Sequence, residues 1–374
     1  MFLPVLFMIQ ISEEKTKMIR NNQNKKRFVW FLTGLCFLLL AACSSGVEEE
    51  QTLLKTPYEQ TEFLMGTYVT LRVYDEGKEA VLEQGFKRVE ELADKITVNE
   101  LDSEIDKINE LAGKEAVELS DEVYPLVEAA AEYSEVSDGG FDYTVGPITD
   151  LWRIGFDDAR KPEQSEIDAA LNLVDFSKVE FDTENKSVFL TEEGMALDLG
   201  AIAKGYIADE IRKLFEDSGV TTAIIDLGGN VIVMGGSPTR EGEAWNVGIQ
   251  DPLSERGETV GKTAQKNRSI VTSGIYERYL EVDGEIYHHL MNPQTGYPFD
   301  NEIAGVSIIS ERSVDGDALS TVVFGLGLEK GLEYVNNRED IEAVFITKDK
   351  EVYTSNGMKD NFELTNEEYT WVNQ

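Results

Sequence analysis

The sequence predicts an α+β fold in which a mostly antiparallel sheet is flanked by helices, arranged as two interleaved subdomains. Strand-like segments occur in runs, and helical segments lie mainly before and after these runs instead of alternating with them. Many links between strand-like segments have hairpin length, whereas parallel strands need long crossovers. Roughly 310 residues remain for folding after the N-terminal region, which is enough for a large core. These observations argue against a doubly wound parallel sheet.

The first half of the folded region is expected to hold one strand, three helices and a hairpin. Residues 67–74 alternate like a strand. A helix is predicted over 81–96 by apolar residues at helical spacing: Leu82, Phe86, Val89, Leu92 and Ile96. A second, short helix is expected around Ile105–Leu111, and Ser120 with Asp121 should cap a third that ends at Tyr133. Residues 179–190 have a hairpin pattern.

The second half is predicted to be richer in strands. A long amphipathic helix is expected over residues 201–217. Strands follow at 222–227, 230–234, 244–249, 269–272, 278–282, 285–291 and 305–309. Helices near 315–326 and 329–336 and strands near 342–347 and 351–355 come next, and residues 358–374 form a C-terminal tail.

The N-terminal region has the pattern of a secretory signal. Lys25-Lys26-Arg27 precedes an apolar run from Phe28 to Leu40, which is too short to span a bilayer as a stable helix. The next residues, Leu40-Ala41-Ala42-Cys43, resemble the lipobox of bacterial lipoproteins, which implies cleavage before Cys43 and a lipid on its thiol. A plain signal peptide with an incidental cysteine is the alternative.

This pattern predicts a signal peptide at 1–42 and a lipidated cysteine with an acidic tether at 43–60. We expect translation to start at Met18, because an extra apolar patch precedes the positive flank. The mature domain would then be anchored by lipid to the cell membrane, on its extracytoplasmic face.

Composition excludes several classes of function. The formal charge is −37, and it becomes −41 when residues 1–42, with six Lys/Arg and two Asp/Glu, are removed. Such an acidic chain will not bind nucleic acid, which requires clustered Lys and Arg. Only one cysteine and two histidines, His288 and His289, follow residue 42, so a multi-ligand zinc site is excluded by count. Any metal should be bound mainly by oxygen, which favours Mg²⁺ or Ca²⁺.

Two glycine-punctuated stretches carry candidate chemistry for a charged ligand. A strand ending near Leu199 meets a predicted helix with Lys204 in its first turn, and a helix N-terminus with a lysine can hold phosphate. An ordinary helix start with an exposed lysine is the alternative. Asp317 and Thr321 lie four residues apart on a predicted helix, so their oxygens share one face and can ligate Mg²⁺. A solvated pair is the alternative.

Two further stretches add a base and an aromatic ring. The two histidines lie between a strand and a Pro/Gly turn, where one can act as general base or simply keep a structural hydrogen bond. Gly139-Gly140 allow close backbone approach to a ligand, and Phe141 can cover a flat ring. Core packing explains Phe141 equally well.

Taken together, these stretches resemble the ApbE family, the FAD:protein FMN transferases, from about Thr61 to Gly357. The motifs occur in family order. They are Met65-Gly66-Thr67, Gly140-Phe141-Asp142 with Thr144-Val145-Gly146-Pro147, Asp198-Leu199-Gly200 with Ile202-Ala203-Lys204-Gly205, Thr272-Ser273-Gly274 with Tyr276, His289 with Pro293 and Thr295-Gly296, and Asp317-Ala318-Leu319 with Thr321.

The resemblance implies Mg²⁺-dependent transfer of FMN from FAD to a Ser or Thr hydroxyl of a partner protein, with release of AMP. It implies metal ligation by Asp317, Thr321, the Ala201 carbonyl and Ser320. It implies FAD contacts by Met65, Gly140, Phe141, Asp142, Asp198, Lys204 and Met291. His289 would be the catalytic base, assisted by Lys204, with His288 structural. The variant Asp317→Ala is expected to abolish transfer and leave the fold intact, on the assumption that Asp317 faces the surface.

Two departures and two alternatives accompany this resemblance. Asn99 stands where many relatives have an aromatic residue, and Asn292 replaces an aspartate that sets a turn before Pro293. The alternatives are an FAD pyrophosphatase that gives FMN and AMP and a non-catalytic flavin-binding lipoprotein. The expected acceptors are extracytoplasmic redox proteins with a Ser/Thr flavinylation motif.

Overall fold

The computed structural model describes residues 52–97 and 103–373. The chain divides into two units, Met1–Thr52 and Leu53–Gln374, and all the helices and strands given below belong to the second unit. The predicted lipidation site Cys43 and the departure at Asn99 lie outside the described residues. No helix in the described ranges is long and apolar enough to cross a membrane.

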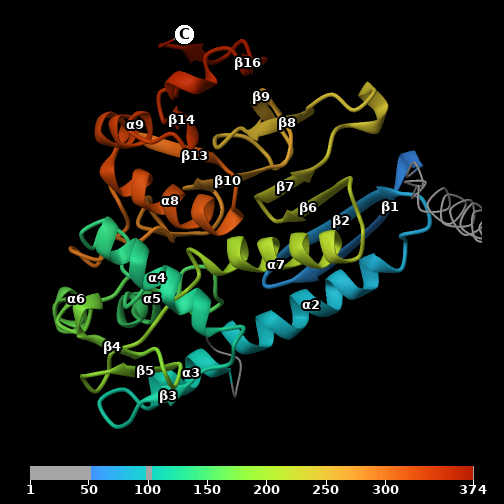
Figure 1. The fold of residues 1–374 in the computed structure, drawn as a ribbon. Helices are drawn as coiled ribbons and strands as arrows, with labels where there is room; N and C mark the ends of the chain where they lie inside the picture. Colours follow the sequence, from blue (N-terminus) through green and yellow to red (C-terminus); the bar gives the residue numbers. More distant parts are fainter. Residues whose placement is uncertain (1–51, 98–102, 374) are drawn as a thin grey trace, which may run out of the picture. The chain divides into compact units, whose positions relative to one another are not determined.

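The centre of the fold is a nine-stranded sheet (Figure 1). Its strands, in spatial order, are β1 (Leu53–Leu64), β2 (Thr67–Asp75), β6 (Ala223–Leu227), β7 (Asn230–Met234), β10 (Arg268–Gly274), β13 (Ile303–Ser310), β14 (Glu342–Thr347), β15 (Glu351–Thr354) and β17 (Thr370–Trp371). Every neighbouring pair is antiparallel except β15 and β17. The predicted α+β class with a mostly antiparallel sheet is confirmed.

Helices cover one face of this sheet and a small sheet covers the other. The covering helices are α2 (Val81–Ile96), α7 (Ala203–Asp217), α8 (Ser313–Leu326) and α9 (Leu328–Asn336), each in contact with the next. The small sheet is β16 (Phe362–Leu364), β9 (Thr259–Gln265) and β8 (Trp245–Gln250). Neighbouring residues of β13 accordingly belong to different apolar clusters, Ile308 on the helical side and Ile309 on the other. Burial on both faces explains why all eight residues of β13 are buried.

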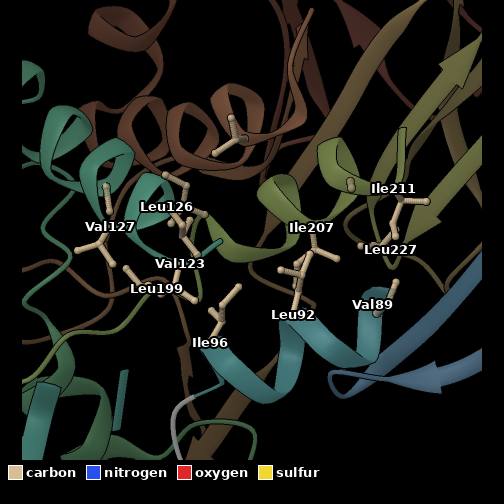
Figure 2. Close-up of a cluster of buried hydrophobic side chains, with 14 of the residues drawn as sticks. Val89, Leu92, Ile96, Val123, Leu126, Val127, Leu199, Ile207, Ile211 and Leu227 are labelled. Carbon is tan, nitrogen blue, oxygen red and sulfur yellow. The ribbon is translucent and has the colours of Figure 1, made fainter. Parts of the chain in front are cut away.

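The remaining elements form a second region inserted between strands of the large sheet. It contains α3 (Glu104–Glu110), α4 (Tyr124–Val136), α5 (Gly146–Trp152) and α6 (Gln164–Leu171), the sheet β3 (Val117–Glu118), β5 (Ser187–Leu190) and β4 (Val179–Asp182), and the hairpin β11 (Tyr279–Val282) with β12 (Glu285–His288). Short 3₁₀ turns lie at Phe176–Lys178, Pro238–Arg240 and Asn356–Met358. Figure 2 shows where side chains of α2, α4 and α7 meet, including Leu92, Leu126 and Ile207.

Several sequence predictions are corrected by this fold. Residues 53–60, predicted as tether, belong to β1, whose residues are all exposed or half-buried, so an edge strand accommodates their polar sequence. The predicted tail contains β16 and β17, which pair with β9 and β15. The third helix starts at Tyr124 and ends at Val136, and Ser120 does not cap it with its side chain. Pro125 in the first turn marks the true start. Strand β9 and helices α5 and α6 were not predicted.

Candidate active site

Helices α7 and α8 touch backbone to backbone at Gly205. A Cβ atom at this position would lie 2.4 Å from the carbonyl oxygen of Ser313 and 2.7 Å from the Cα of Val314. Only glycine permits this approach, because real Cβ atoms do not come so close to a backbone atom. Asp209 of α7 also caps α8, since its carboxylate accepts the backbone N–H groups of Ser313 (3.0 Å) and Val314 (2.9 Å). We call this contact the α7–α8 junction.

The junction presents Asp317 to the start of α7. The Asp317 carboxylate accepts the backbone N–H of Gly205 at 2.8 Å, and its other oxygen lies 3.4 Å from the Lys204 ammonium. Asp317 is only 3% exposed. The assumption that it faces the surface is therefore wrong, and replacement by alanine would also leave a backbone N–H without its partner.

Lys204 has a second partner that sequence reasoning missed. Its ammonium donates to the side-chain oxygen of Asn230 at 2.9 Å, a shorter distance than that to Asp317. The lysine side chain remains about one-third exposed, so its charge can reach a ligand. The sequence signal for this contact is the Gly228-Gly229 pair directly before Asn230, in the short link between two predicted strands.

Two of the other predicted metal ligands, Ser320 and Thr321, lie on α8 with Asp317, and the third is the Ala201 carbonyl before α7. Thr321 follows one turn later on α8 and is largely buried. In a regular helix the Gly205 N–H would donate to the carbonyl four residues earlier, that of Ala201, but here it donates to Asp317. The Ala201 carbonyl therefore accepts none of the hydrogen bonds among the described residues. Ser320 is fully buried, donates to the Asp317 carbonyl at 2.7 Å and lies 2.7 Å from the Ser273 hydroxyl of β10. Ser320 thus has structural partners of its own.

This donor set fits Mg²⁺ that is shared with phosphate oxygens. No cluster of three or more His, Cys, Asp or Glu side chains that could hold a metal occurs in the described ranges. One carboxylate, one hydroxyl and one carbonyl are too few for a protein-only site. They suffice for Mg²⁺, which keeps waters and commonly binds through one or two carboxylates together with substrate phosphates.

The two histidines have different environments. The ring of His288 lies 2.9 Å from the Phe299 carbonyl through Nε2, and its Nδ1 accepts the Leu290 N–H at 3.3 Å. Both ring nitrogens are therefore used, and burial lowers the pKa of His288 to about 4. This supports the interpretation that His288 is structural.

His289 is held in a form suited to accept a proton. Its Nδ1 lies 3.2 Å from the Arg278 carbonyl, which can only accept, so Nδ1 carries the hydrogen. Burial, followed by the positive charges of Arg278 and Lys204, lowers the pKa of His289 to about 3. The neutral ring then has its lone pair on Nε2, for which the described residues supply no hydrogen-bond partner.

Arg278 connects the histidine to the Met65-Gly66 turn. Its side chain approaches Gly66, where a Cβ would lie 3.1 Å from a guanidinium nitrogen, and Gly155, where a Cβ would lie 2.8 Å from Cδ. Both glycines and Met65 have positive φ, so these turns are conformationally constrained. Arg278 was not singled out in the sequence, because a lone exposed arginine carries no pattern.

The structure brings two of the predicted FAD contacts together before the start of α7, Asp198 and the Gly140-Phe141-Asp142 segment. The backbone N–H of Asp198 donates to the Tyr143 carbonyl at 2.9 Å, which brings the Gly140-Phe141-Asp142 segment alongside. The Asp198 carboxylate accepts the Gly200 N–H at 2.8 Å and stays half-exposed.

Within this segment, side chains that were predicted to touch FAD have protein partners. Phe141 is buried in the core, with its ring edge-on to Tyr133. Asp142 accepts hydrogen bonds from the N–H and hydroxyl of Thr144, and burial raises its pKa. Contacts from this segment to a ligand would thus come most readily from its backbone and Gly140.

Met291 and Asn292 lie in the loop after β12. Met291 is buried beside Trp152 of α5. Asn292 closes the turn as the usual aspartate would, because its side-chain oxygen accepts the N–H groups of Gln294 (2.8 Å) and Thr295 (3.3 Å). The amide oxygen makes the hydrogen bonds that set this turn.

Known proteins are similar to this chain in sequence and in structure. The ApbE family model matches residues 65–345. A Klebsiella pneumoniae protein named FAD:protein FMN transferase is 40% identical over 305 residues, covering 82% of this chain and 94% of that protein. One of the same name from Treponema pallidum is 36% identical over 318 residues, covering 81% and 88%. The crystal structure of the Thermotoga maritima ApbE protein, at 30% identity, superposes with a TM-score of 0.75 over 82% of this chain and 99% of that one.

The fold and the site, with these relatives, define the class of this protein: it is a transferase enzyme. More narrowly, the chain belongs to the ApbE family, whose model spans well over half of its length. The family resemblance seen in the sequence motifs is confirmed.

Proposed function

We propose that this protein transfers FMN from FAD to a Ser or Thr hydroxyl of an acceptor protein, requires Mg²⁺ and releases AMP. The observation that carries the proposal is the buried Asp317 carboxylate held by the backbone of α7 and 3.4 Å from Lys204. This supports the proposal because a carboxylate that would ligate Mg²⁺ and a cation that would bind phosphate lie side by side in an otherwise acidic protein. The name shared by relatives at 40% and 36% identity supports the flavin substrate.

Phosphoryl transfer depends mainly on positioning and on neutralising charge. Lys204 and the N–H groups at the start of α7 would bind the pyrophosphate of FAD. Asp317, Thr321 and the Ala201 carbonyl would hold Mg²⁺, which when bound polarises phosphate oxygens and neutralises their charge.

His289 would activate the acceptor. The hydroxyl oxygen forms a bond to the phosphorus of the FMN moiety as its proton passes to Nε2 of His289. The bond between that phosphorus and the bridging oxygen breaks, and the electron pair leaves with AMP. A ring with a pKa near 3 is unprotonated at neutral pH but a weak base. The negative phosphates of bound FAD would raise this pKa toward a useful range.

The location of the reaction follows from the N-terminal signal. We propose that a lipid on Cys43 anchors the enzyme to the extracytoplasmic face of the cell membrane. Its acceptors would be redox proteins on the same side, bearing a Ser/Thr flavinylation motif. A lipid is needed there because the net charge of −41 that remains without residues 1–42 is repelled by anionic headgroups.

Mass spectrometry tests this function directly. Residues 44–374 are incubated with FAD, Mg²⁺ and a peptide of the form Asp-x-x-Thr-Gly-Ala-Thr. An FMN adduct on threonine that EDTA prevents is the expected result. The test is repeated with other hydroxyl acceptors. Release of free FMN and AMP while every acceptor stays unmodified would instead indicate a pyrophosphatase. Binding of FAD without turnover would indicate a flavin-binding protein and overturn the proposal.

A further inference from the structure

Asn230 determines where the Lys204 ammonium lies. The ammonium has two oxygen partners: the neutral amide of Asn230 at 2.9 Å and the carboxylate of Asp317 at 3.4 Å. Charge alone would favour the carboxylate, because a negative charge attracts the ammonium more strongly than the dipole of a neutral amide does. The shorter distance to the amide shows that the lysine is drawn away from Asp317.

The orientation of the Asn230 side chain is fixed by chemistry. An ammonium can only donate, so the amide oxygen must face Lys204 and the amide cannot be flipped. Asn230 is 1% exposed, and its side-chain nitrogen is buried without a hydrogen-bond partner among the described residues. A buried polar group left unsatisfied is costly, so this arrangement is unfavourable for stability alone.

The backbone of Asn230 is equally constrained. It pairs with Val271 of β10 and directly follows Gly228 and Gly229, whose φ angles are +65° and +108°. The N–H groups of both glycines point to the Asp226 carboxylate, at 3.0 and 3.4 Å. A Cβ at Gly228 would lie 1.9 Å from the Thr67 hydroxyl, so the turn has no room for a side chain at this position.

We propose that Asn230 is a positioning residue that holds the Lys204 ammonium off Asp317, so that the carboxylate stays available to a metal and the ammonium to phosphate. An aspartate at this position would give Lys204 two carboxylate partners and cancel its charge; a neutral amide orients the lysine without neutralising it. The inference rests on the proposed function for the identity of the phosphate ligand. The distances that carry it do not depend on that identity.

The first test is structural. A crystal structure of Asn230→Ala is expected to show the distance between the Lys204 ammonium and the Asp317 carboxylate shortened from 3.4 Å to about 2.8 Å. A lysine that stays where it is would overturn the inference, whatever the enzyme does with FAD. The matched control is Asn301→Ala, which removes an asparagine that donates to the Phe324 carbonyl.

The second test is a double-mutant cycle on FAD binding, measured by quenching of flavin fluorescence without Mg²⁺. Asn230→Ala should weaken binding about tenfold when Lys204 is present and less than about twofold in a Lys204→Met background. Asn230→Asp, which has the same shape, should weaken it at least as much as the alanine variant. Equal losses in both backgrounds would show a purely structural role and overturn the inference.

Transfer assays separate this inference from the proposed function. Asn230→Ala should raise the Mg²⁺ concentration needed for half-maximal transfer, because Lys204 then competes for Asp317. If no acceptor is labelled but lysine position and FAD binding change as expected, the positioning role stands and the transferase proposal fails. If transfer occurs and Asn230→Ala alters neither binding nor the Mg²⁺ requirement, the positioning role fails alone.

Discussion

The two halves of the active site are supported in different ways. At the α7–α8 junction, Asp317 is 3% exposed and bonded to the backbone of a second helix. His289 instead follows the two-stranded hairpin β11–β12, where Tyr279 and Ile286 are 54% and 61% exposed, and it is oriented by one carbonyl group. The half that handles charge is therefore built on a helix–helix contact in the core, whereas the histidine follows a two-stranded hairpin with exposed side chains. Substitutions in the first half should affect stability and chemistry together, whereas those in the second should affect chemistry alone.

The largest effect on stability and transfer is expected from Gly205→Ala, which disrupts the α7–α8 junction directly. The new Cβ would meet the Ser313 carbonyl at 2.4 Å, so α7 and α8 must separate and Asp317 must move. We expect a loss of about 1–3 kcal/mol in the free energy of unfolding together with loss of transfer. Denaturant unfolding and the FMN-transfer assay measure the two effects.

Gly284→Ala in the turn of the β11–β12 hairpin is the matched control. Nothing lies within 4 Å of a Cβ there, although φ is +85°. It should show only the cost of backbone strain and keep its activity. If Gly205→Ala unfolds normally and transfers FMN at the wild-type rate, the junction is not the rigid element described here.

Asp317→Asn should separate charge from packing within the junction. An asparagine oxygen can still accept the Gly205 N–H, so most of the stability should remain. Transfer should fall by roughly 10²–10³-fold, the scale for removing one electrostatic element of a preorganised site. Excess Mg²⁺ should restore little of it. Activity near that of the wild type at limiting Mg²⁺ would exclude Asp317 as a metal ligand.

His289→Gln tests the half of the site that follows the β11–β12 hairpin. Glutamine can still donate to the Arg278 carbonyl but cannot accept the proton from a hydroxyl and become a stable cation. We expect the transfer rate to fall about 10²-fold, with FAD affinity and the unfolding midpoint unchanged. Single-turnover kinetics with pre-bound FAD isolate this step. A matching loss of FAD affinity would show that His289 binds substrate instead of taking its proton.

The same contrast explains what the sequence could predict. Helix α2 was predicted with its observed ends, because its apolar face packs on neighbouring elements with strict helical spacing. Strand β9 was missed because residues 259–265 include a lysine, two threonines and a glutamine, and because β16, one of its two partners, lies in the segment predicted as a tail. Hydrophobic periodicity in the sequence indicates which face of a strand is buried, but it does not indicate which distant strand pairs with it.

The chemistry of the site was predictable to a similar extent. Asp317, Lys204 and His289 were identified as residue types in recurring motifs, and the structure places the Lys204 ammonium 3.4 Å from the Asp317 carboxylate. The burial of Asp317 and the role of Asn230 were not predictable, because both arise from a contact between α7, α8 and β7. Two of these elements are separated by about a hundred residues in the chain.

The smallest expected effect concerns His288, which lies beside the base but belongs to the core. Its pKa is about 4 in the folded protein, below the ordinary value of 6.5. Between these values the unfolded chain binds a proton that the folded protein does not, so His288 favours folding above pH 6.5 and loses that contribution as the pH falls toward 4. His288→Asn, which can still accept from Leu290, should flatten this dependence by about 1–3 kcal/mol relative to the wild type. Unfolding midpoints are measured at pH 7 and pH 4.5 for the wild type and for His288→Asn. Subtracting the pH effect of one protein from that of the other removes the contribution of the carboxylates that both proteins share. Parallel pH profiles would mean that His288 can be protonated without loss of its contacts, and would place it with His289 outside the rigid half of the site.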